Sequence, residues 1–293
     1  MATDIIEGLK TREELIETVQ LSYAPVSLAV QDQRKFDIAG AETIQFRQLD
    51  VEKESVVAEA LTPGETEVAH IKAKEGTKKF YKVLRGAKII QSTRNFGFNR
   101  IPELISKIVR LYSQMFDRFA LYGKDGNNGI ITTSDPNAIT NNAVAVNMSA
   151  EGATEQKIMN TVLRAVSKLK RQVSSYTAST NVLVYVYGAK LLECLDTVTY
   201  NGMSIREAIE RAWPQAAFID VPGLVTEGAE EGFVAISQNL VTMNYTHIPT
   251  MDDSGYNREN KYFWADFEIG SVGIDVREEG ALIKQPMTVT LPA

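Results

Sequence analysis

Apolar residues recur at intervals of three and four in two long stretches, and each stretch predicts an amphipathic helix. The first is expected over residues 101–121, with Pro102 in its opening turn and Gly123 at its end. The second is expected over residues 154–173, and basic side chains in its last turns suit the helix dipole. The apolar stripe of the first helix predicts one buried face, formed by Ile101, Leu104, Ile105, Ile108, Leu111, Tyr112, Met115, Phe116 and Phe119.

Strand-length runs with partial alternation occupy residues 42–90, and charged residues interrupt each of them. These runs hold too few apolar residues to fill a two-sided core, so they predict a long β-hairpin that projects from the body. About 20 residues per arm reach about 60 Å in extended conformation. Two turn signals compete for its tip, Thr62-Pro63-Gly64 and Glu75-Gly76.

The remaining pattern mixes helices and strands. Residues 1–40 predict an arm with one or two short helices, and residues 181–187 predict a buried strand followed by a short helix from Gly188 to Leu192. Ser204 and Glu207 have the spacing of a capping box, which predicts a helix that Pro214 ends. Further strands are expected at 216–221, 232–237, 240–248, 261–270, 272–276 and 287–291. The predicted class is α+β with a projecting β element.

Composition narrows the function. The 293 residues carry 31 Lys and Arg against 37 Asp and Glu, a net charge of −6, which argues against sequence-independent coating of nucleic acid but leaves a local basic patch open. The hydrophobic share of 44% is that of folded, soluble proteins. No apolar run approaches the roughly 18 residues that cross a bilayer, and no secretion signal is recognised at the N-terminus. We therefore expect neither membrane association nor export.

Candidate catalytic and metal-binding groups have ordinary structural interpretations. The glycine-rich loop at 123–129 follows a helix and lacks the Gly-Lys-Ser/Thr of a phosphate-binding loop and the acids of a calcium loop. His70 and His247 lie in no nucleophile or base motif, and two histidines cannot form a three-His metal site. The lone Cys194 is interpreted as a packing residue. No catalytic residue, cofactor or metal is therefore expected.

Two further clusters have similar interpretations. Glu227, Glu230 and Glu231 are interpreted as a solvated loop rather than metal ligands. An aromatic cluster favours a core strand or a subunit contact over base stacking, because the segment is acidic. The cluster comprises Tyr256, Tyr262, Phe263, Trp264 and Phe267.

The order of these features resembles the major capsid proteins of tailed bacteriophages with the Hong Kong 97-like fold. Residues 56–66 followed by 78–93 are similar to the extended loop and return strand of that family, and Leu121-Tyr122-Gly123 to the turn after its spine helix. Residues 216–224 and 232–247 are similar to its central strands, and the tail around Pro286 to its final strands. The resemblance covers residues 40–293 and depends on the ordered set.

The resemblance implies an arm at 1–41, an extended loop with return strand at 42–92, and an axial domain at 151–250. A peripheral domain with spine helix 101–121 would comprise 93–150 and 251–293. It implies a non-enzymatic protein of the virion capsid that self-assembles as pentamers and hexamers, in the host bacterial cytoplasm, around double-stranded DNA. Implied partners are other copies, and possibly a separate scaffolding protein, a portal and a decoration protein. Expected inter-subunit contacts are Val56, Val57, Glu59, Pro63, Glu65, His70, Lys72, Lys74 and Arg85. The residues singled out on the spine helix itself are Leu104, Ile108, Met115 and Phe119.

One departure from the family matters. Members that cross-link their subunits covalently carry a reactive lysine on the extended loop, and the tip assigned to residues 62–64 has none. We therefore predict a non-cross-linked shell, although Lys72, Lys74 or Lys78 could substitute. The sequence also lacks a long charged helical N-terminal extension, which predicts that any scaffold is a separate protein.

Three alternatives stay open. An encapsulin-like compartment shell that encloses a cargo enzyme would need an apolar groove, which Ile5, Ile6 and Leu9 could supply. An enzyme on an unfamiliar α+β fold would show activity as a monomer. A minor vertex or decoration protein of a virion is the third.

Overall fold

In the computed structural model the chain forms two compact units, Asp37–Lys82 and the remainder of the chain. The structure describes residues 26–30, 32–35, 43–51, 71–79, 84–85, 89–92, 101–124, 127–148, 154–173, 181–221, 230–257, 262–270 and 272–291.

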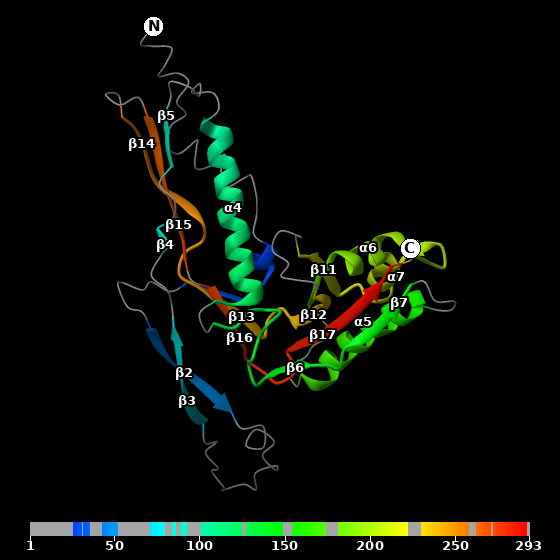
Figure 1. The fold of residues 1–293 in the computed structure, drawn as a ribbon. Coiled ribbons are helices and arrows are strands. Elements are labelled where there is room, and N and C mark those ends of the chain that lie inside the picture. The colour runs from blue at the N-terminus through cyan, green and yellow to red at the C-terminus, as the bar shows by residue number, and fades with distance from the viewer. Residues whose placement is uncertain are drawn as a thin grey trace, which may run out of the picture. The chain divides into compact units, whose positions relative to one another are not determined.

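The larger unit contains a mixed six-stranded sheet (Figure 1). Its order is β11-β8-β12-β17-β6, and β7 also pairs with β17. Every residue of β8 is buried, because both sheet faces are covered there. The bounds are β6 Ala138–Thr140, β7 Val144–Asn147, β8 Val182–Tyr187, β11 Ala216–Asp220, β12 Glu231–Ser237 and β17 Leu282–Thr290.

Two helices contact this sheet, and a third helix packs on both of them (Figure 1). α5 (Thr154–Gln172) contacts β7, β12 and β17, and α6 (Ala189–Thr197) contacts β8, β12 and β17. α7 (Ile205–Ala212) packs on both helices. A two-stranded ladder of β9 (Thr199–Tyr200) and β10 (Met203–Ser204) joins α6 to α7.

The longest helix among the described residues, α4 (Ile101–Tyr122), confirms the predicted helix over 101–121. It contacts β15, β16 and the short 3-10 helix η1 (Val26–Ala29). In one sheet beside it, β13 (Val241–Tyr245) lies between β1 (Asp32–Lys35), which is parallel to it, and β16 (Val272–Val276). In another sheet, β15 (Tyr262–Ile269) pairs with β14 (Thr250–Asn257), β4 (Leu84–Arg85) and β5 (Ile89–Ser92).

The smaller unit holds an antiparallel pair of strands, β2 (Thr43–Val51) and β3 (Ile71–Lys79). Its register runs from Thr43 opposite Lys79 to Val51 opposite Ile71, which confirms the antiparallel pairing expected of a hairpin. The turn predicted at Glu75-Gly76 is wrong, because both residues lie within β3, opposite Arg47 and Phe46. The other predicted tip, residues 62–64, lies outside the described residues.

Several local predictions can be compared directly. The capping box is present: the Ser204 hydroxyl accepts from the Glu207 N–H at 3.2 Å, and the Glu207 carboxylate accepts from the Ser204 N–H at 3.1 Å. The predicted helix end at Leu192 is wrong, because α6 continues to Thr197 and buries Cys194 and Leu195 on its inner face. The assignment of Glu231 to a loop is also wrong, since β12 begins there.

The six-stranded sheet draws strands from both predicted domains. β8, β11 and β12 lie between residues 151 and 250, whereas β6, β7 and β17 come from the ranges assigned to the peripheral domain. Part of the predicted arm, η1 with β1, lies against α4 and β13 of the larger unit.

Candidate interaction surfaces

The exposed face of α4 carries two large apolar side chains. Leu111 is 57% exposed and Met115, one turn later, is 41% exposed. The prediction that both lie on the buried face is wrong, because that face is formed by Val109, Phe116 and Ala120 together with polar side chains. The buried polar residues are Ser113, Gln114 and Asp117. Apolar periodicity located a stripe along the helix. Because polar residues are buried as well, the buried face of α4 does not coincide with that stripe.

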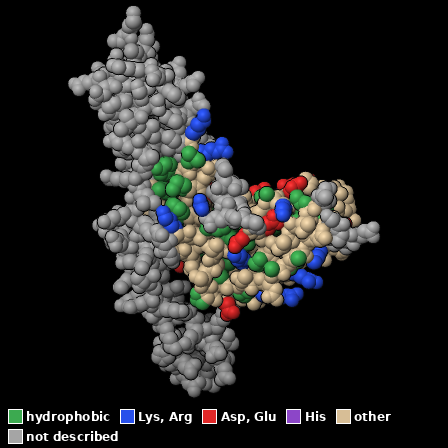
Figure 2. Space-filling view, in the orientation of Figure 1, with side chains coloured by type: hydrophobic (Ala, Val, Ile, Leu, Met, Phe, Trp, Pro, Cys, Tyr) green, Lys and Arg blue, Asp and Glu red, His purple; other side chains and the backbone are tan. Residues whose placement is uncertain are grey.

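Basic residues border these two side chains. Lys107, Arg110 and Arg118 are exposed on the same helix. Figure 2 shows hydrophobic side chains gathered over α4 with Lys and Arg close to them. We call Lys107, Arg110, Leu111, Met115 and Arg118 the α4 strip. Exposed apolar groups gathered on one face are a common mark of a protein contact surface.

The end of α4 is closed by the glycine-rich turn. Gly123 has a φ of +73° and donates its N–H to the Phe119 carbonyl at 2.8 Å. The N–H groups of Ile130 and Ile131 then donate to the carbonyls of Ala120 and Leu121 at 2.9 and 2.7 Å. In the described part of this loop the backbone therefore satisfies the helix end, which agrees with its interpretation as a structural turn.

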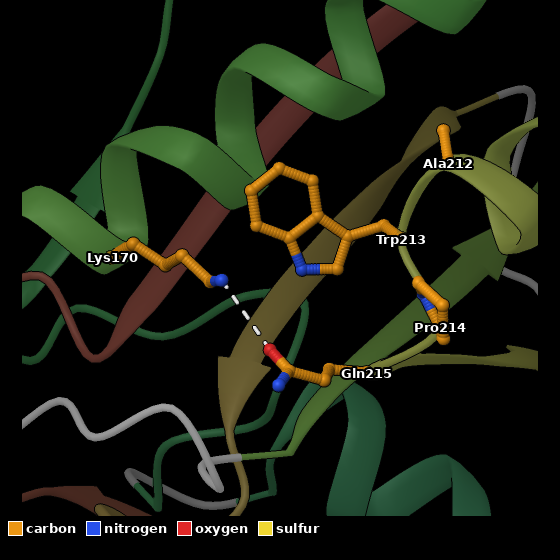
Figure 3. A pocket seen from close by; sticks show the side chains of 5 residues that line it. All are labelled: Lys170, Ala212, Trp213, Pro214 and Gln215. Atoms are coloured by element: carbon orange, nitrogen blue, oxygen red, sulfur yellow. Dashed lines mark hydrogen bonds between the residues drawn. The ribbon is translucent and has the colours of Figure 1, made fainter.

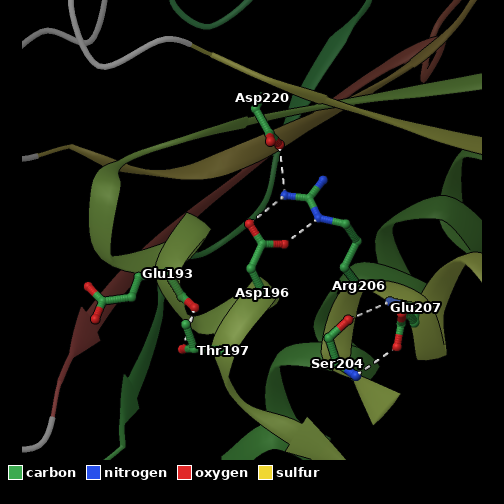
Figure 4. Close-up of polar contacts among 7 residues, drawn as sticks. All are labelled: Glu193, Asp196, Thr197, Ser204, Arg206, Glu207 and Asp220. Carbon is green, nitrogen blue, oxygen red and sulfur yellow. Dashed lines mark hydrogen bonds and ion pairs between the residues drawn. The ribbon is translucent and has the colours of Figure 1, made fainter.

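A charged cluster lies between α6, α7 and β11 (Figure 4). Arg206 Nε donates to Asp196 Oδ1 at 2.6 Å, and Nη2 donates to Asp220 Oδ1 at 2.8 Å. Burial alone would lower the pKa of Arg206, but the hydrogen bonds and charges of the two aspartates together raise it. The guanidinium also lies 5.7 Å from the centroid of the Phe218 ring. Sequence analysis missed this cluster, because its three charges come from three separate elements.

A surface recess of about 380 Å³ lies beside the end of α7 (Figure 3). The Lys170 ammonium lies 4.1 Å from the Trp213 ring centroid and donates to the Gln215 side chain at 3.3 Å. Ala212 and Pro214 complete the lining. The described lining therefore offers one ammonium and one amide among apolar groups, and it contains no carboxylate, thiol or hydroxyl side chain.

Potentially reactive groups lie apart from these surfaces. Cys194 is a buried free thiol, and burial, followed by the charges of Glu193 and Glu231, raises its pKa to about 11. The Glu231 carboxylate accepts the Val289 N–H at 3.3 Å, and burial raises its pKa. Among the described residues no group of three His, Cys, Asp or Glu is placed to hold a metal ion. No described helix is long and apolar enough to cross a membrane.

The predicted contact residues and spine-helix residues fall into three groups. Met115 lies on the α4 strip, and Phe119 is half-buried against the core with the Lys124 ammonium 4.4 Å from its ring centroid. Leu104 and Ile108 belong to α4, Lys72 and Lys74 lie on β3, and Arg85 on β4 pairs with Glu268, all described by backbone alone. Outside the described residues lie Val56, Val57, Glu59, Pro63, Glu65 and His70.

The comparison with solved structures identifies the fold. The chain matches the capsid of Myoviridae phage XM1 with a TM-score of 0.61 and 12% identity, over 90% of this chain and 92% of that chain. It has the Hong Kong 97-like capsid fold. The capsid of cyanophage P-SCSP1u matches this Hong Kong 97-like chain with a TM-score of 0.55 and 9% identity, over 91% and 89% of the two chains.

The chain is also similar in structure to a virus-like particle from Pyrococcus furiosus. Its TM-score is 0.57 at 10% identity, over 94% of this chain and 97% of that chain. No family model matches the sequence, and no curated protein matches it. The resemblance in fold that was inferred from an ordered set of weak motifs is therefore confirmed by the structural comparison. The sequence identities are low, at 9–12% in the three matches described.

Proposed function

We propose that this chain is the major capsid protein of a tailed bacteriophage, which self-assembles as pentamers and hexamers into an icosahedral shell around double-stranded DNA. One observation carries the proposal: the fold matches the capsid of phage XM1 over 90% of this chain and 92% of that one. The shared fold therefore extends through the α4 region and the central sheet rather than covering one module.

The α4 strip supports an assembling protein. Two large apolar side chains on the exposed face of one helix gain free energy when a neighbour covers them, at about 25 cal/mol per Å² of apolar surface. The basic residues beside them suit an acidic partner surface. Such contacts are individually weak, but symmetry repeats each of them through a closed shell.

The finer parts of the proposal follow the family resemblance. Residues 1–41 act as an arm, 42–92 as an extended loop with return strand, and 151–250 as an axial domain, while 93–150 and 251–293 form a peripheral domain. The protein is structural rather than catalytic, assembles in the host cytoplasm, and is held in the shell without covalent cross-links. A scaffolding protein, a portal and a decoration protein are its further partners.

A second candidate is a compartment shell that encloses a cargo enzyme. The match to the virus-like particle from Pyrococcus furiosus favours keeping it, because the coverage of the two chains is as complete as in the phage comparison. The two candidates share the assembly and differ in what is enclosed.

The first experiment is negative-stain electron microscopy of the purified chain, with light scattering on the same sample. Closed shells, capsomer rings, tubes or sheets are expected. A stable monomer of 32.5 kDa at high concentration, also after scaffold-containing lysate is added, contradicts the proposal. Sequencing the nucleic acid and identifying any protein inside native particles separates a genome container from an enzyme compartment.

Cross-linking has its own test. Particles boiled in detergent are expected to give a single band at the mass of the chain. A ladder of covalent multimers would show that a lysine such as Lys72, Lys74 or Lys78 forms the bond despite the lysine-free tip.

A further inference from the structure

One face of α5 carries four basic side chains and no acidic one. Lys157, Arg164 and Arg171 are exposed and Lys168 is half-buried. At 100° per residue the four side chains lie within about 60° of one another around the helix axis, and they span about 21 Å along it. The other residues of this face carry amides or hydroxyls: Gln156, Asn160, Thr161, Ser167 and Gln172. We call these nine residues the α5 basic face.

This face lacks the acids that a solvent-facing helix ordinarily mixes with its bases. The single acid of α5 is Glu155 in its first turn. The neighbouring helices are mixed, with Lys190, Glu193 and Asp196 on α6 and both signs on α7. Because the whole chain has a net charge of −6, four cations without an acid do not simply follow from composition. Two acids, Glu278 and Glu279, belong to the turn whose Gly280 lies against Gln172 at the end of α5.

Two of the four cations are held in position. The Lys157 ammonium donates to the Ala145 carbonyl at 2.7 Å, and the Lys168 ammonium donates to the Asn141 side chain at 2.7 Å. Each bond uses one of three donor hydrogens, so both ammonium groups keep donors for a ligand. Within the described part of the chain, neither Arg164 nor Arg171 joins an ion pair.

We infer that the α5 basic face binds the phosphate backbone of nucleic acid without reading its sequence. A stretch of about 21 Å faces about six phosphates of one duplex strand. Arginine, lysine, amide and hydroxyl groups are the side chains that contact phosphate oxygens. A protein partner is less well matched, because the centre of a protein interface buries apolar side chains and this face has none.

The inference goes beyond enclosure of the genome by a closed shell. It depends on the proposed function for two points. The first is that the nucleic acid is the packaged genome, and the second is that this face of α5 lines the inner side of the shell. Nucleic-acid binding by the face itself can be tested without a shell.

The test compares two full-length variants that lose the same charge. Arg164→Gln/Arg171→Gln removes two cations from the α5 basic face, and the matched control Lys190→Gln/Arg211→Gln removes two from exposed positions on α6 and α7. Binding of a short labelled DNA duplex is measured by fluorescence anisotropy across a salt series, below the concentration at which particles form. Light scattering on each sample gives the particle mass.

The α5 variant is expected to lose affinity at least about tenfold at low salt, and its slope of log K against log salt shrinks by about 2. The control keeps the wild-type slope. The charge-preserving variant Arg164→Lys/Arg171→Lys keeps it too, which a merely structural role of the guanidinium groups would not allow. Circular dichroism checks that each variant is folded. If the double glutamine variant is not folded, the single variant Arg164→Gln is measured in its place, beside Arg164→Lys/Arg171→Lys.

Three results would overturn the inference: no loss in the α5 variant, an equal loss in the control, or binding of poly-glutamate as tight as that of DNA. The last would indicate an acidic protein as the ligand. If the α5 variant assembles normally and its DNA binding is unchanged, the inference is overturned and the proposed function is kept. Lost DNA binding in a chain that never forms particles removes the proposed function and keeps the inference.

Discussion

Ser27 and Asp117 lie 90 positions apart in the sequence and are joined by two hydrogen bonds to one oxygen. The Ser27 N–H donates to Asp117 Oδ1 at 2.9 Å, and its hydroxyl donates to the same atom at 2.7 Å. Both residues are fully buried. The pair fastens η1 to the inner face of α4, so the N-terminal segment is attached to the body at this point.

Replacing Asp117 by Ala is expected to lower the free energy of unfolding by about 2–3 kcal/mol, because two buried donors lose a charged acceptor. Urea unfolding of the dissociated chain measures this. Ser237→Ala is the control: the Ser237 hydroxyl is buried and, among the described residues, has no hydrogen-bond partner, so its removal is expected to leave the free energy of unfolding unchanged or to raise it. Equal losses in the two variants would show that the Ser27–Asp117 pair does not stabilise the fold.

Replacing both apolar residues of the α4 strip, as Leu111→Ser/Met115→Ser, is expected to weaken assembly while the isolated chain stays folded. Both side chains are exposed, so the substitution changes the free energy of unfolding by less than about 0.5 kcal/mol. Light scattering across a concentration series is expected to show a higher concentration for particle formation. Ala217→Ser, on the exposed side of β11, is the control and leaves assembly unchanged. Wild-type assembly by the α4 variant would exclude this strip as a contact.

Replacing Arg206 by Lys is expected to destabilise the chain by about 1 kcal/mol. One ammonium cannot hold Asp196 and Asp220 in the two-sided geometry of the guanidinium. The loss stays small because the Arg206 side chain is 17% exposed but each aspartate is 52% exposed and therefore partly screened by water. A double-mutant cycle with Asp220→Asn measures the coupling. Arg211→Lys on the same helix is the control, and an equal effect there would contradict the assignment.

Stability is expected to fall as the pH rises above about 9. The unfolded Cys194 thiol ionises near 9.0, whereas in the folded chain burial raises its pKa to about 11, so the folded chain keeps a proton that the unfolded chain has lost. This contribution is complete below pH 9 and is lost as the pH approaches 11. Burial also raises the pKa of Tyr185 and Tyr187, which extends the fall to higher pH.

Urea unfolding from neutral pH to about pH 10 checks this prediction. Cys194→Ala is expected to unfold more easily overall because of the lost packing, but with a shallower pH dependence between about 9 and 10. A thiol reagent is expected to modify the folded wild type slowly. An unchanged pH slope in the alanine variant would show that the Cys194 proton does not contribute.

Local elements could be predicted from the sequence, because helix ends, caps and buried runs leave short-range signals. Spacing located α4 and α5 to within one residue, and Ser204 with Glu207 marked the start of α7. The orientation of α4 could not be predicted, since burial of Asp117 depends on Ser27, which is distant in the sequence. Glu75-Gly76 has the composition of a turn, but cross-strand pairing with Arg47 and Phe46 keeps it extended.

For the candidate surfaces, too, local features could be predicted from the sequence, and features that depend on tertiary packing could not. Residues of the extended loop were chosen as contacts from its predicted shape, and those that the structure describes are described by backbone alone. Met115 was predicted on the apolar stripe of the spine helix, and the structure places it on an exposed surface. Leu111 carries no sequence signal that separates it from a core leucine. The α5 basic face is visible as a spacing of bases, but its lack of neighbouring acids becomes clear once helix packing shows which positions face outward.

The position of β17 has a consequence for biosynthesis. This strand, Leu282–Thr290, pairs with β12, β6 and β7 and so joins parts of the sheet that come from earlier in the chain. A ribosome that stops before residue 282 releases a product without this strand, whose apolar residues Leu282, Ile283, Met287 and Val289 are all buried in the complete fold. Such a product leaves β12, β6 and β7 without their common partner strand, so this sheet can be completed only after residues 282–290 have been synthesised.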